Sequence, residues 1–199
     1  MRVLPITNPT MVFDAEINNV IKILREGGVI LYPTDTIWGL GCDATNDEAV
    51  KKIFRIKSRA DSKSLIILVD SDTMLGRYVK EVPDIAYELI DVSDKPLTII
   101  YPGAKNLAAS IPAEDGSVGI RICNDDFCNE LIRRFRKPVV STSANISGES
   151  SPSFFKEING KIIQAVDYVV DYKKEDRQRN FPSPVIKIEV NGTIQIIRK

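Results

Sequence analysis

Histidine is absent from this sequence of 199 residues. Its absence excludes Ser–His–Asp and Cys–His catalysis, histidine zinc sites and any imidazole proton shuttle. Cysteine is scarce too, because only Cys42, Cys123 and Cys128 occur and no two of them form a C-x-x-C pair. This odd number favours free thiols in a reducing compartment over a disulfide framework or a metal site.

An excess of charge of one sign is also missing. Lys plus Arg and Asp plus Glu each number 27, so the formal net charge is zero. That balance gives no overall attraction to nucleic acid or to an anionic membrane, and RNA could be contacted only through a local basic patch. No apolar stretch approaches the length of a membrane span, and the first residues lack the apolar core of a signal peptide. We therefore expect a cytoplasmic protein with no membrane partner.

The remaining composition is ordinary for a globular protein, with 43% hydrophobic and 27% charged residues. A length of 199 residues suits one large domain, and no linker, internal repeat or low-complexity segment divides the chain. We expect a single domain over residues 1–199.

One stretch, from Gly27 to Leu68, organises the rest of the chain. The pattern predicts a strand over 29–32, a polar tip of Thr-Asp-Thr at 34–36 and a second strand over 37–41. A helix capped by Asn46 or Asp47 should follow, and then a third strand over 65–69.

Lys57 is the most informative residue of that stretch. It lies four residues after Ile53 and three after Phe54, so it falls within the apolar stripe of the helix. A buried ammonium needs an anionic partner. Arg59 and Lys63 complete a K-x-R-x-x-x-K pattern beside the Thr-Asp-Thr tip, which indicates a pocket for a polyanion such as a nucleoside triphosphate. The alternative is a solvated basic surface after a helix, although the phase of Lys57 argues against it.

A second polar segment follows a buried strand that is predicted to begin at Val139. The sequence Ser-Thr-Ser-Ala-Asn at 141–145 reads as a loop leaving that strand. Ligands bind where strands of α/β sheets end, because short polar side chains and backbone groups are exposed there. The alternative is a turn that satisfies its own backbone. Arg121 is a single charge inside the apolar strand predicted over 117–122.

The rest of the chain alternates helices and strands. We expect a strand and a turn over 1–13, and then a helix that is capped by Asp14 and ended by Gly27-Gly28. A helix capped by Asp125 or Asp126 is expected, and Asn191-Gly192 predicts a terminal hairpin of strands 185–190 and 193–197. The mixture indicates one mixed-sheet α/β domain.

Four motifs together carry a family resemblance: P-T-D-T-I-W-G-L-G at 33–41, K-S-R-A-D-S-K-S-L at 57–65, S-V-G-I-R-I at 117–122 and S-T-S-A-N-I-S-G at 141–148. With these motifs in this order the chain resembles the YrdC family of threonylcarbamoyl-AMP synthases. The resemblance implies an α/β fold, a twisted mixed sheet forming an open, barrel-like core with a concave basic cavity. It also implies a reaction in which L-threonine, bicarbonate and ATP give threonylcarbamoyl-AMP and pyrophosphate. A partner threonylcarbamoyl transferase would then use the product to modify tRNA.

The resemblance also assigns roles to residues of this sequence. It implies that Lys57 and Arg59 are catalytic, and that Ser141 lines the pocket floor. The threonine-binding residues would be Thr36, Arg121 and Ser183. The nucleotide-binding residues would be Arg59, Lys63, Ser117, Ser143, Asn145, Ser151 and Arg198. It assigns no metal ligand to the protein, and Mg²⁺ would be held largely by the phosphates of ATP.

Two further functions stay open at this point. The chain could be a paralogue with the same fold that has lost synthesis, or a module that binds double-stranded RNA, tRNA or ribosomal RNA through the basic cavity. The retention of Lys57, Arg59 and Arg121 argues against a degenerate site, and the zero net charge weakens the RNA-binding alternative.

Overall fold

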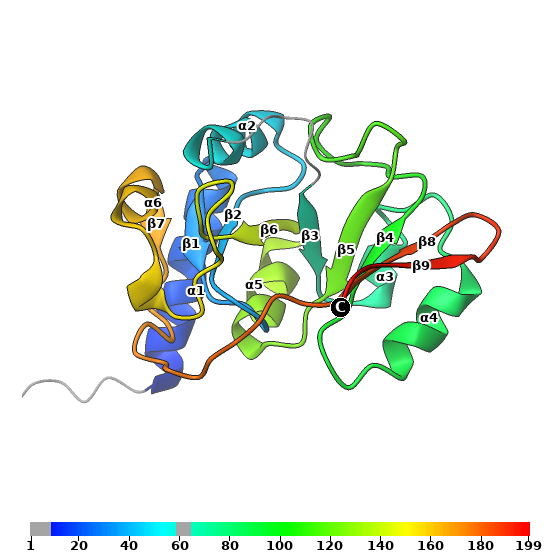
Figure 1. Ribbon diagram of the computed structural model, residues 1–199. Helices are drawn as coiled ribbons and strands as arrows, with labels where there is room; N and C mark the ends of the chain where they lie inside the picture. Colours follow the sequence, from blue (N-terminus) through cyan, green and yellow to red (C-terminus); the bar gives the residue numbers. More distant parts are fainter. Residues whose placement is uncertain (1–8, 59–64) are drawn as a thin grey trace, which may run out of the picture.

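A mixed β-sheet forms the centre of the protein (Figure 1). The structure, a computed structural model, describes residues 9–58 and 65–199. Within these residues nine strands lie in the order β7-β1-β2-β6-β3-β5-β4-β8-β9. Their bounds are β1 (Ile30–Tyr32), β2 (Gly39–Gly41), β3 (Ile66–Val69), β4 (Thr98–Tyr101), β5 (Val118–Ile122), β6 (Val139–Ser143), β7 (Tyr168–Val169), β8 (Val185–Ile188) and β9 (Ile194–Arg198).

The sheet is open, because β7 and β9 are its two outermost strands and do not pair with each other. Three neighbouring pairs are parallel, namely β1–β7, β3–β5 and β4–β8, and the other pairs are antiparallel. The expected fold class, an α/β protein with a twisted mixed sheet that does not close, is confirmed.

Helices cover this sheet and connect its strands. The helices are α1 (Pro9–Arg25), α2 (Asp47–Ile56), α3 (Asp72–Leu75), α4 (Asp84–Asp91), α5 (Asp126–Phe135) and α6 (Gly160–Ala165), with a 3-10 helix η1 (Phe155–Glu157). The side chain of Asn46 caps α2 by accepting a hydrogen bond from the N–H of Ala49, and Asp125 caps α5 in the same way. Both caps were among the predicted alternatives.

The predicted start of the first helix is wrong. We expected Asp14 to be its cap, but α1 begins at Pro9, and residues 9–13 are helical instead of strand and turn. Proline suits the first turn of a helix because its fixed φ is helical and it has no N–H that would need a partner. Asp14 instead pairs with Arg134 of α5 at 2.5 Å. Residues 1–8 lie outside the described part of the chain.

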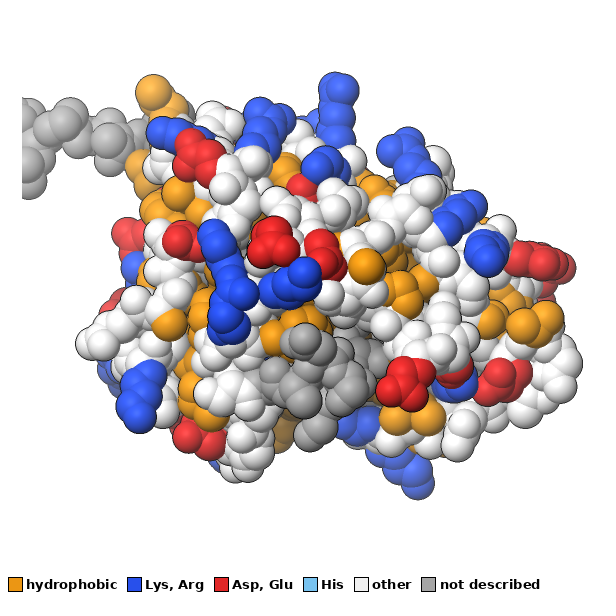
Figure 2. Space-filling view, turned by 90° about the horizontal axis from the view of Figure 1, so that it is seen from above, with side chains coloured by type: hydrophobic (Ala, Val, Ile, Leu, Met, Phe, Trp, Pro, Cys, Tyr) orange, Lys and Arg blue, Asp and Glu red, His pale blue; other side chains and the backbone are white. Residues whose placement is uncertain are grey.

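The surface carries both signs of charge. Seen from above, blue and red side chains are interspersed, and no large region of one colour covers this face (Figure 2). This agrees with the formal net charge of zero. A broad basic surface for nucleic acid is therefore not evident on this side.

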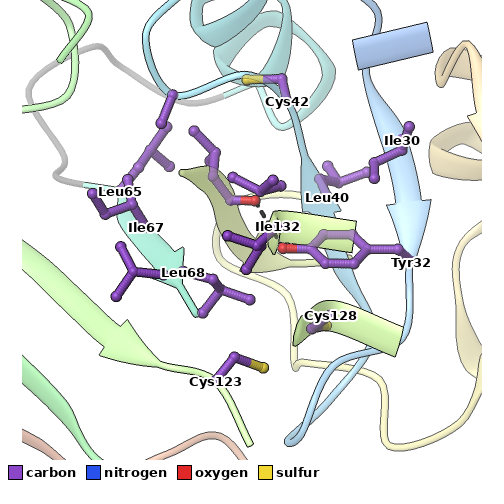
Figure 3. Packing of buried hydrophobic residues seen from close by; sticks show 14 of the residues in the cluster. Ile30, Tyr32, Leu40, Cys42, Leu65, Ile67, Leu68, Cys123, Cys128 and Ile132 are labelled. Atoms are coloured by element: carbon purple, nitrogen blue, oxygen red, sulfur yellow. Dashed lines mark hydrogen bonds between the residues drawn. The ribbon is translucent and has the colours of Figure 1, made fainter. Parts of the chain in front are cut away.

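Helices α1 and α5 pack against each other and against the sheet, and the hydrophobic core extends from there to the buried faces of α2 and α3. The predicted apolar stripe of α1, from Ile17 to Leu24, is buried. Figure 3 shows Tyr32 reaching into this core, where its hydroxyl donates a hydrogen bond to the carbonyl of Val140 at 2.9 Å. This packing fixes the positions of β1 and β6. It thereby fixes the Thr-Asp-Thr tip at 34–36, which follows β1, and the polar residues at the end of β6.

The terminal hairpin forms as predicted. Strands β8 and β9 pair antiparallel, and Gly192 in the connecting turn has a φ of +81°, a backbone conformation that glycine tolerates. Figure 1 shows the segment in orange, between β7 and β8, running across the front of the sheet before the chain enters this hairpin. That segment carries Ser183 to the candidate site.

Candidate functional site

One face of the sheet gathers the predicted site residues. The register places Ile66 beside both Gly119 and Ser141, and Ser143 beside Gly39. Because side chains alternate between the two faces of a strand, Ser141 and Ser143 point to the same face, and Arg121 of β5 points to it too. Period-2 alternation along three strands therefore brings these side chains together.

A cavity of about 220 Å³ opens on this face. It brings together six of the residues to which the sequence assigned substrate binding, and it also includes the predicted floor residue Ser141. The six are Thr36, Arg121, Ser143, Ser151, Ser183 and Arg198. Gly39 lies on the wall, where a Cβ atom would come within 3.2 Å of the Thr142 carbonyl oxygen and 3.4 Å of the Ser141 hydroxyl, so a side chain there would crowd both groups.

Arg121 forms the centre of this cavity wall. Its side chain is 2% exposed, and its Nη2 lies 2.8 Å from the Asp35 carboxylate, whose side chain is 3% exposed. The guanidinium also donates to the hydroxyls of Ser183 and Thr36, each at 3.3 Å. Its Nε has no hydrogen-bond partner among the described residues. An arginine in an apolar strand is thus explained by a buried carboxylate and a ring of hydroxyls.

Arg198 faces the same cavity from β9. Its Nε and Nη2 donate to the carbonyl of Ser183 at 3.0 and 2.7 Å. Burial lowers the pKa of Arg198, and repulsion from the nearby Arg121 guanidinium lowers it further. Ser183, assigned to the threonine end, and Arg198, assigned to the nucleotide end, are therefore in direct contact. Two guanidinium groups that face one small cavity favour an anionic ligand.

Lys57 is buried, as its helical phase predicted, with 2% of its surface exposed. The expected anionic partner of Lys57 stays a prediction. Its ammonium donates to the backbone carbonyls of Ser143 and Asn145, at 2.5 and 2.7 Å. These carbonyl oxygens stabilise the ammonium, because each one offers a negative dipole end to it. Lys57 therefore holds the segment that follows β6.

The polar segment at 141–145 is partly strand, which corrects the prediction of a loop. Thr142 pairs with Leu40 and Ser143 with Gly39, so β6 continues to Ser143. The turn begins only at Ala144. Pairing with β2 extends the strand, and this tertiary contact is not visible in the local sequence.

Asn145 does not line the cavity, although it lies next to it. Its Nδ2 donates to the carbonyls of Ile146 and Glu149, while its buried Oδ1 accepts no hydrogen bond from the described residues. Ser117 also lies outside the cavity lining. Its hydroxyl donates to Asp115 at 2.6 Å, and this bond together with Lys187 lowers the pKa of Asp115 to about 2. The structure thus does not bring Ser117 and Asn145 into the cavity wall.

Arg59 and Lys63 lie outside the described residues. The expectation of a basic cavity is therefore not established. In the described lining of the 220 Å³ cavity, Arg121 and Arg198 are the charged groups, and one of them is paired with a carboxylate.

Sequence reasoning assigned no role to two residues of this site, Asp35 and Thr98. Thr98 is completely buried, and its hydroxyl lies 2.7 Å from that of Ser183. Asp35 could have been found, because a buried arginine needs a carboxylate and Asp35 lies in the Thr-Asp-Thr tip. No local signal marks Thr98, whose contact spans 85 residues of sequence.

A larger cavity of about 620 Å³ adjoins the first and shares Thr36, Ile37 and Trp38 with it. Asp35 lines this larger cavity, whereas Arg121 lines the smaller one. The ion pair between these two residues therefore lies in the wall that separates the cavities.

The described residues contain no group of three or more His, Cys, Asp or Glu side chains placed to hold a metal ion. No helix in the same part of the chain is long and apolar enough to cross a membrane. The three cysteines, Cys42, Cys123 and Cys128, are buried free thiols, as their number and spacing predicted.

Comparison with known proteins gives consistent results. The family model of Sua5, YciO and YrdC proteins, described as "Telomere recombination", matches residues 22–199. The threonylcarbamoyl-AMP synthase of Pseudoalteromonas translucida is 33% identical over 177 residues, which cover 87% of this chain and 93% of that protein.

Solved structures agree with this match. Escherichia coli YciO has a TM-score of 0.80 and 25% identity over 92% of this chain and 88% of YciO. P. abyssi Sua5 complexed with L-threonine has a TM-score of 0.77 and 28% identity over 86% of this chain. The chain spans 50% of the length of that Sua5 protein.

Proposed function

The chain belongs to the Sua5–YciO–YrdC family, and from this we propose that it is a threonylcarbamoyl-AMP synthase. The enzyme forms L-threonylcarbamoyladenylate and pyrophosphate from L-threonine, bicarbonate and ATP, which makes it a nucleotidyltransferase. The observation that carries this proposal is that Arg121 and Arg198 both line one cavity, together with several hydroxyl groups. One guanidinium suits a carboxylate and the other suits a phosphate.

The threonine end is built around Arg121. Its guanidinium binds the α-carboxylate of threonine, and Thr36 and Ser183, which already contact it, orient the amino acid through their hydroxyls. A planar guanidinium can bind a carboxylate through two parallel hydrogen bonds. This explains why the strand carries arginine, since lysine offers only a point charge.

The nucleotide end lies beside it. Arg198 and the hydroxyls of Ser143 and Ser151 bind ATP, together with Arg59 and Lys63 from the segment that follows Lys57. Ser117 and Asn145, which lie outside the described lining, belong to the proposed nucleotide contacts as well. Lys57 supports them by holding the backbone carbonyls of Ser143 and Asn145.

The chemistry follows from positioning and charge neutralisation. The threonine amine attacks the carbon of bicarbonate and water leaves, which gives a carbamate on the threonine nitrogen. An oxygen of this carbamate then attacks the α-phosphate of ATP. Pyrophosphate leaves, and the cations stabilise the charge that develops on the phosphates. Arg59 acts as a catalytic residue on the phosphates, Lys57 contributes to catalysis through the Ser143–Asn145 segment that it positions, and no step requires an imidazole.

Mg²⁺ is expected to enter with ATP. Mg²⁺ that accompanies a nucleoside triphosphate is commonly coordinated by phosphate oxygens together with water and one or two protein oxygens. When bound there, the ion neutralises phosphate charge. The contacts to threonine and ATP proposed above are made by side chains of this chain and not by the ion.

The product must be passed on. We propose that a threonylcarbamoyl transferase complex accepts threonylcarbamoyl-AMP and modifies tRNA in the cytoplasm, where ATP and tRNA are available. Direct contact of this chain with tRNA or double-stranded RNA would use the segment 51–63, which contains several cations.

A direct assay tests the proposal. Purified protein is incubated with ATP, Mg²⁺, bicarbonate and labelled threonine, and both threonylcarbamoyl-AMP and pyrophosphate are quantified. Both products should appear in equal amounts and depend on bicarbonate. An Arg133→Gln variant, altered at an exposed arginine of α5, should match the wild type.

The opposite result is equally specific. Absence of both products from folded protein, with salt-dependent binding of double-stranded RNA in the absence of ATP, would replace the synthase proposal by the RNA-binding alternative.

A further inference from the structure

Asp35 is a buried carboxylate to which the proposed reaction assigns no substrate contact. Its side chain is 3% exposed and lies in the wall between the two cavities. Oδ1 lies 2.8 Å from Nη2 of Arg121, and Oδ1 accepts no well-aligned hydrogen bond from any described residue. The contact is therefore mainly ionic.

The tip fixes the position of this carboxylate. Thr34 donates to the carbonyl of Ile37 at 2.9 Å and accepts a hydrogen bond from the backbone N–H of Thr36 at 3.1 Å. From the other side, the N–H of Asn124 donates to Oδ2 of Asp35 at 3.3 Å. The carboxylate is therefore held by the tip and by the segment that follows β5, independently of any ligand.

The ion pair leaves much of the Arg121 guanidinium available. A guanidinium has five N–H donors, and the carboxylate of Asp35 contacts only Nη2. Nη1 makes long hydrogen bonds, at 3.3 Å to Ser183 and 3.5 Å to Thr98, and the buried Nε has no described partner. A second carboxylate can therefore bind the same guanidinium.

We propose that Asp35 is a positioning and specificity-determining residue, which orients Arg121 and reserves it for the α-carboxylate of threonine. This inference rests on the proposed function. The carboxylate of Asp35 holds one edge of the guanidinium and cancels its charge, so the pair is neutral before substrate binds. A monoanionic carboxylate can still bind by replacing weak hydrogen bonds. The multiply charged triphosphate of ATP, bound next to Arg198, is repelled by Asp35 and stays out of the threonine end.

The test compares Asp35→Asn, Arg121→Gln and the double variant in the synthase assay, with threonine and ATP varied separately. Asp35→Asn should raise the KM for threonine by about tenfold, since charge-assisted hydrogen bonds depend on the orientation of the guanidinium. Its kcat at saturating threonine should change little. Inorganic triphosphate should become a competitive inhibitor against threonine in this variant and not in the wild type.

The double variant distinguishes positioning from a separate role. If Asp35 acts through Arg121, adding Asp35→Asn to Arg121→Gln should not raise the KM for threonine further. Asp94→Asn is the matched control, because Asp94 lines the same larger cavity without contacting Arg121. Asp94→Asn should keep the KM values of the wild type.

Folding is checked by circular dichroism. If Asp35→Asn does not fold, Asp35→Glu keeps the charge and displaces the carboxylate by one methylene, and it should raise the KM for threonine with little change in kcat. An unchanged KM for threonine in every folded Asp35 variant, while the wild type forms product, would overturn this inference alone. Absence of product from the wild type would instead overturn the proposed function.

Discussion

The burial of Lys57 leads to a quantitative prediction for Lys57→Met. Methionine has nearly the same length, so the substitution removes the ammonium without opening a large cavity. Two hydrogen bonds to the carbonyls of Ser143 and Asn145 are lost. A hydrogen bond from a charged group contributes roughly 1.5–3 kcal/mol, and relief from burying the ammonium offsets part of the loss.

We therefore expect the free energy of unfolding to fall by about 2–4 kcal/mol. For a domain of this size each kcal/mol shifts the melting temperature by about 2–4 °C, so Tm should fall by about 5–15 °C. Turnover should fall at least about tenfold, because the loosened segment carries Ser143 into the cavity.

The assay combines thermal unfolding with the synthase reaction at a temperature at which the variant is fully folded. Lys51→Met is the matched control, since Lys51 lies on the same helix with its side chain 41% exposed. It should melt and turn over like the wild type. If Lys57→Met matched the wild type in both measurements, the reasoning that a buried ammonium organises the segment after β6 would be refuted.

Three further outcomes are expected. Arg121→Gln should raise the KM for threonine more than that for ATP, measured by steady-state kinetics, and the reverse would show that the two ends of the cavity are exchanged. Burial raises the pKa of the thiols of Cys42 and Cys128. At pH 8 a disulfide reagent should therefore label them slowly in native protein and rapidly in protein unfolded by guanidinium. Rapid labelling of native protein would contradict their burial. The pKa of Asp115 is lowered to about 2, so its contribution to stability is present above the unfolded value of about 3.9 and is lost as the pH falls through about 2. Urea unfolding of Asp115→Asn should accordingly show lower stability than the wild type at pH 7 and a smaller difference at pH 2, whereas an equal difference at both pH values would rule out the ionised carboxylate as its cause.

The local elements were predictable from short-range patterns. The apolar spacing from Ala49 to Ile56 and a cap at Asn46 are enough for α2, and the Asn191-Gly192 pair is enough for the terminal hairpin. The predicted start of α1 is wrong because Asp14 also suits a helix cap, although Pro9, which suits a first helical turn, is a local signal for the true start. The single domain over residues 1–199 stays a prediction.

The sequence predicted which residues belong to the candidate site better than it predicted where each of them lies relative to the cavity. The motifs identified Thr36, Arg121 and Ser183, and the structure brings all three to one cavity. Ser117 and Asn145 share motifs with cavity residues, yet each lies outside the lining. Side chains of residues adjacent in sequence point in different directions in a strand or a turn. Residues of one sequence motif therefore need not line the same cavity wall.

The sequence by itself determined which side chains had to be accounted for: a lysine in the apolar stripe of a helix and an arginine inside an apolar strand, with no histidine available. Only the tertiary structure decided their partners. Lys57 contacts carbonyls 86 and 88 residues away, and Arg121 reaches Asp35 across the sheet. Helical and strand periodicity fixes the face on which a side chain lies, but the pairing of distant strands decides what that face meets.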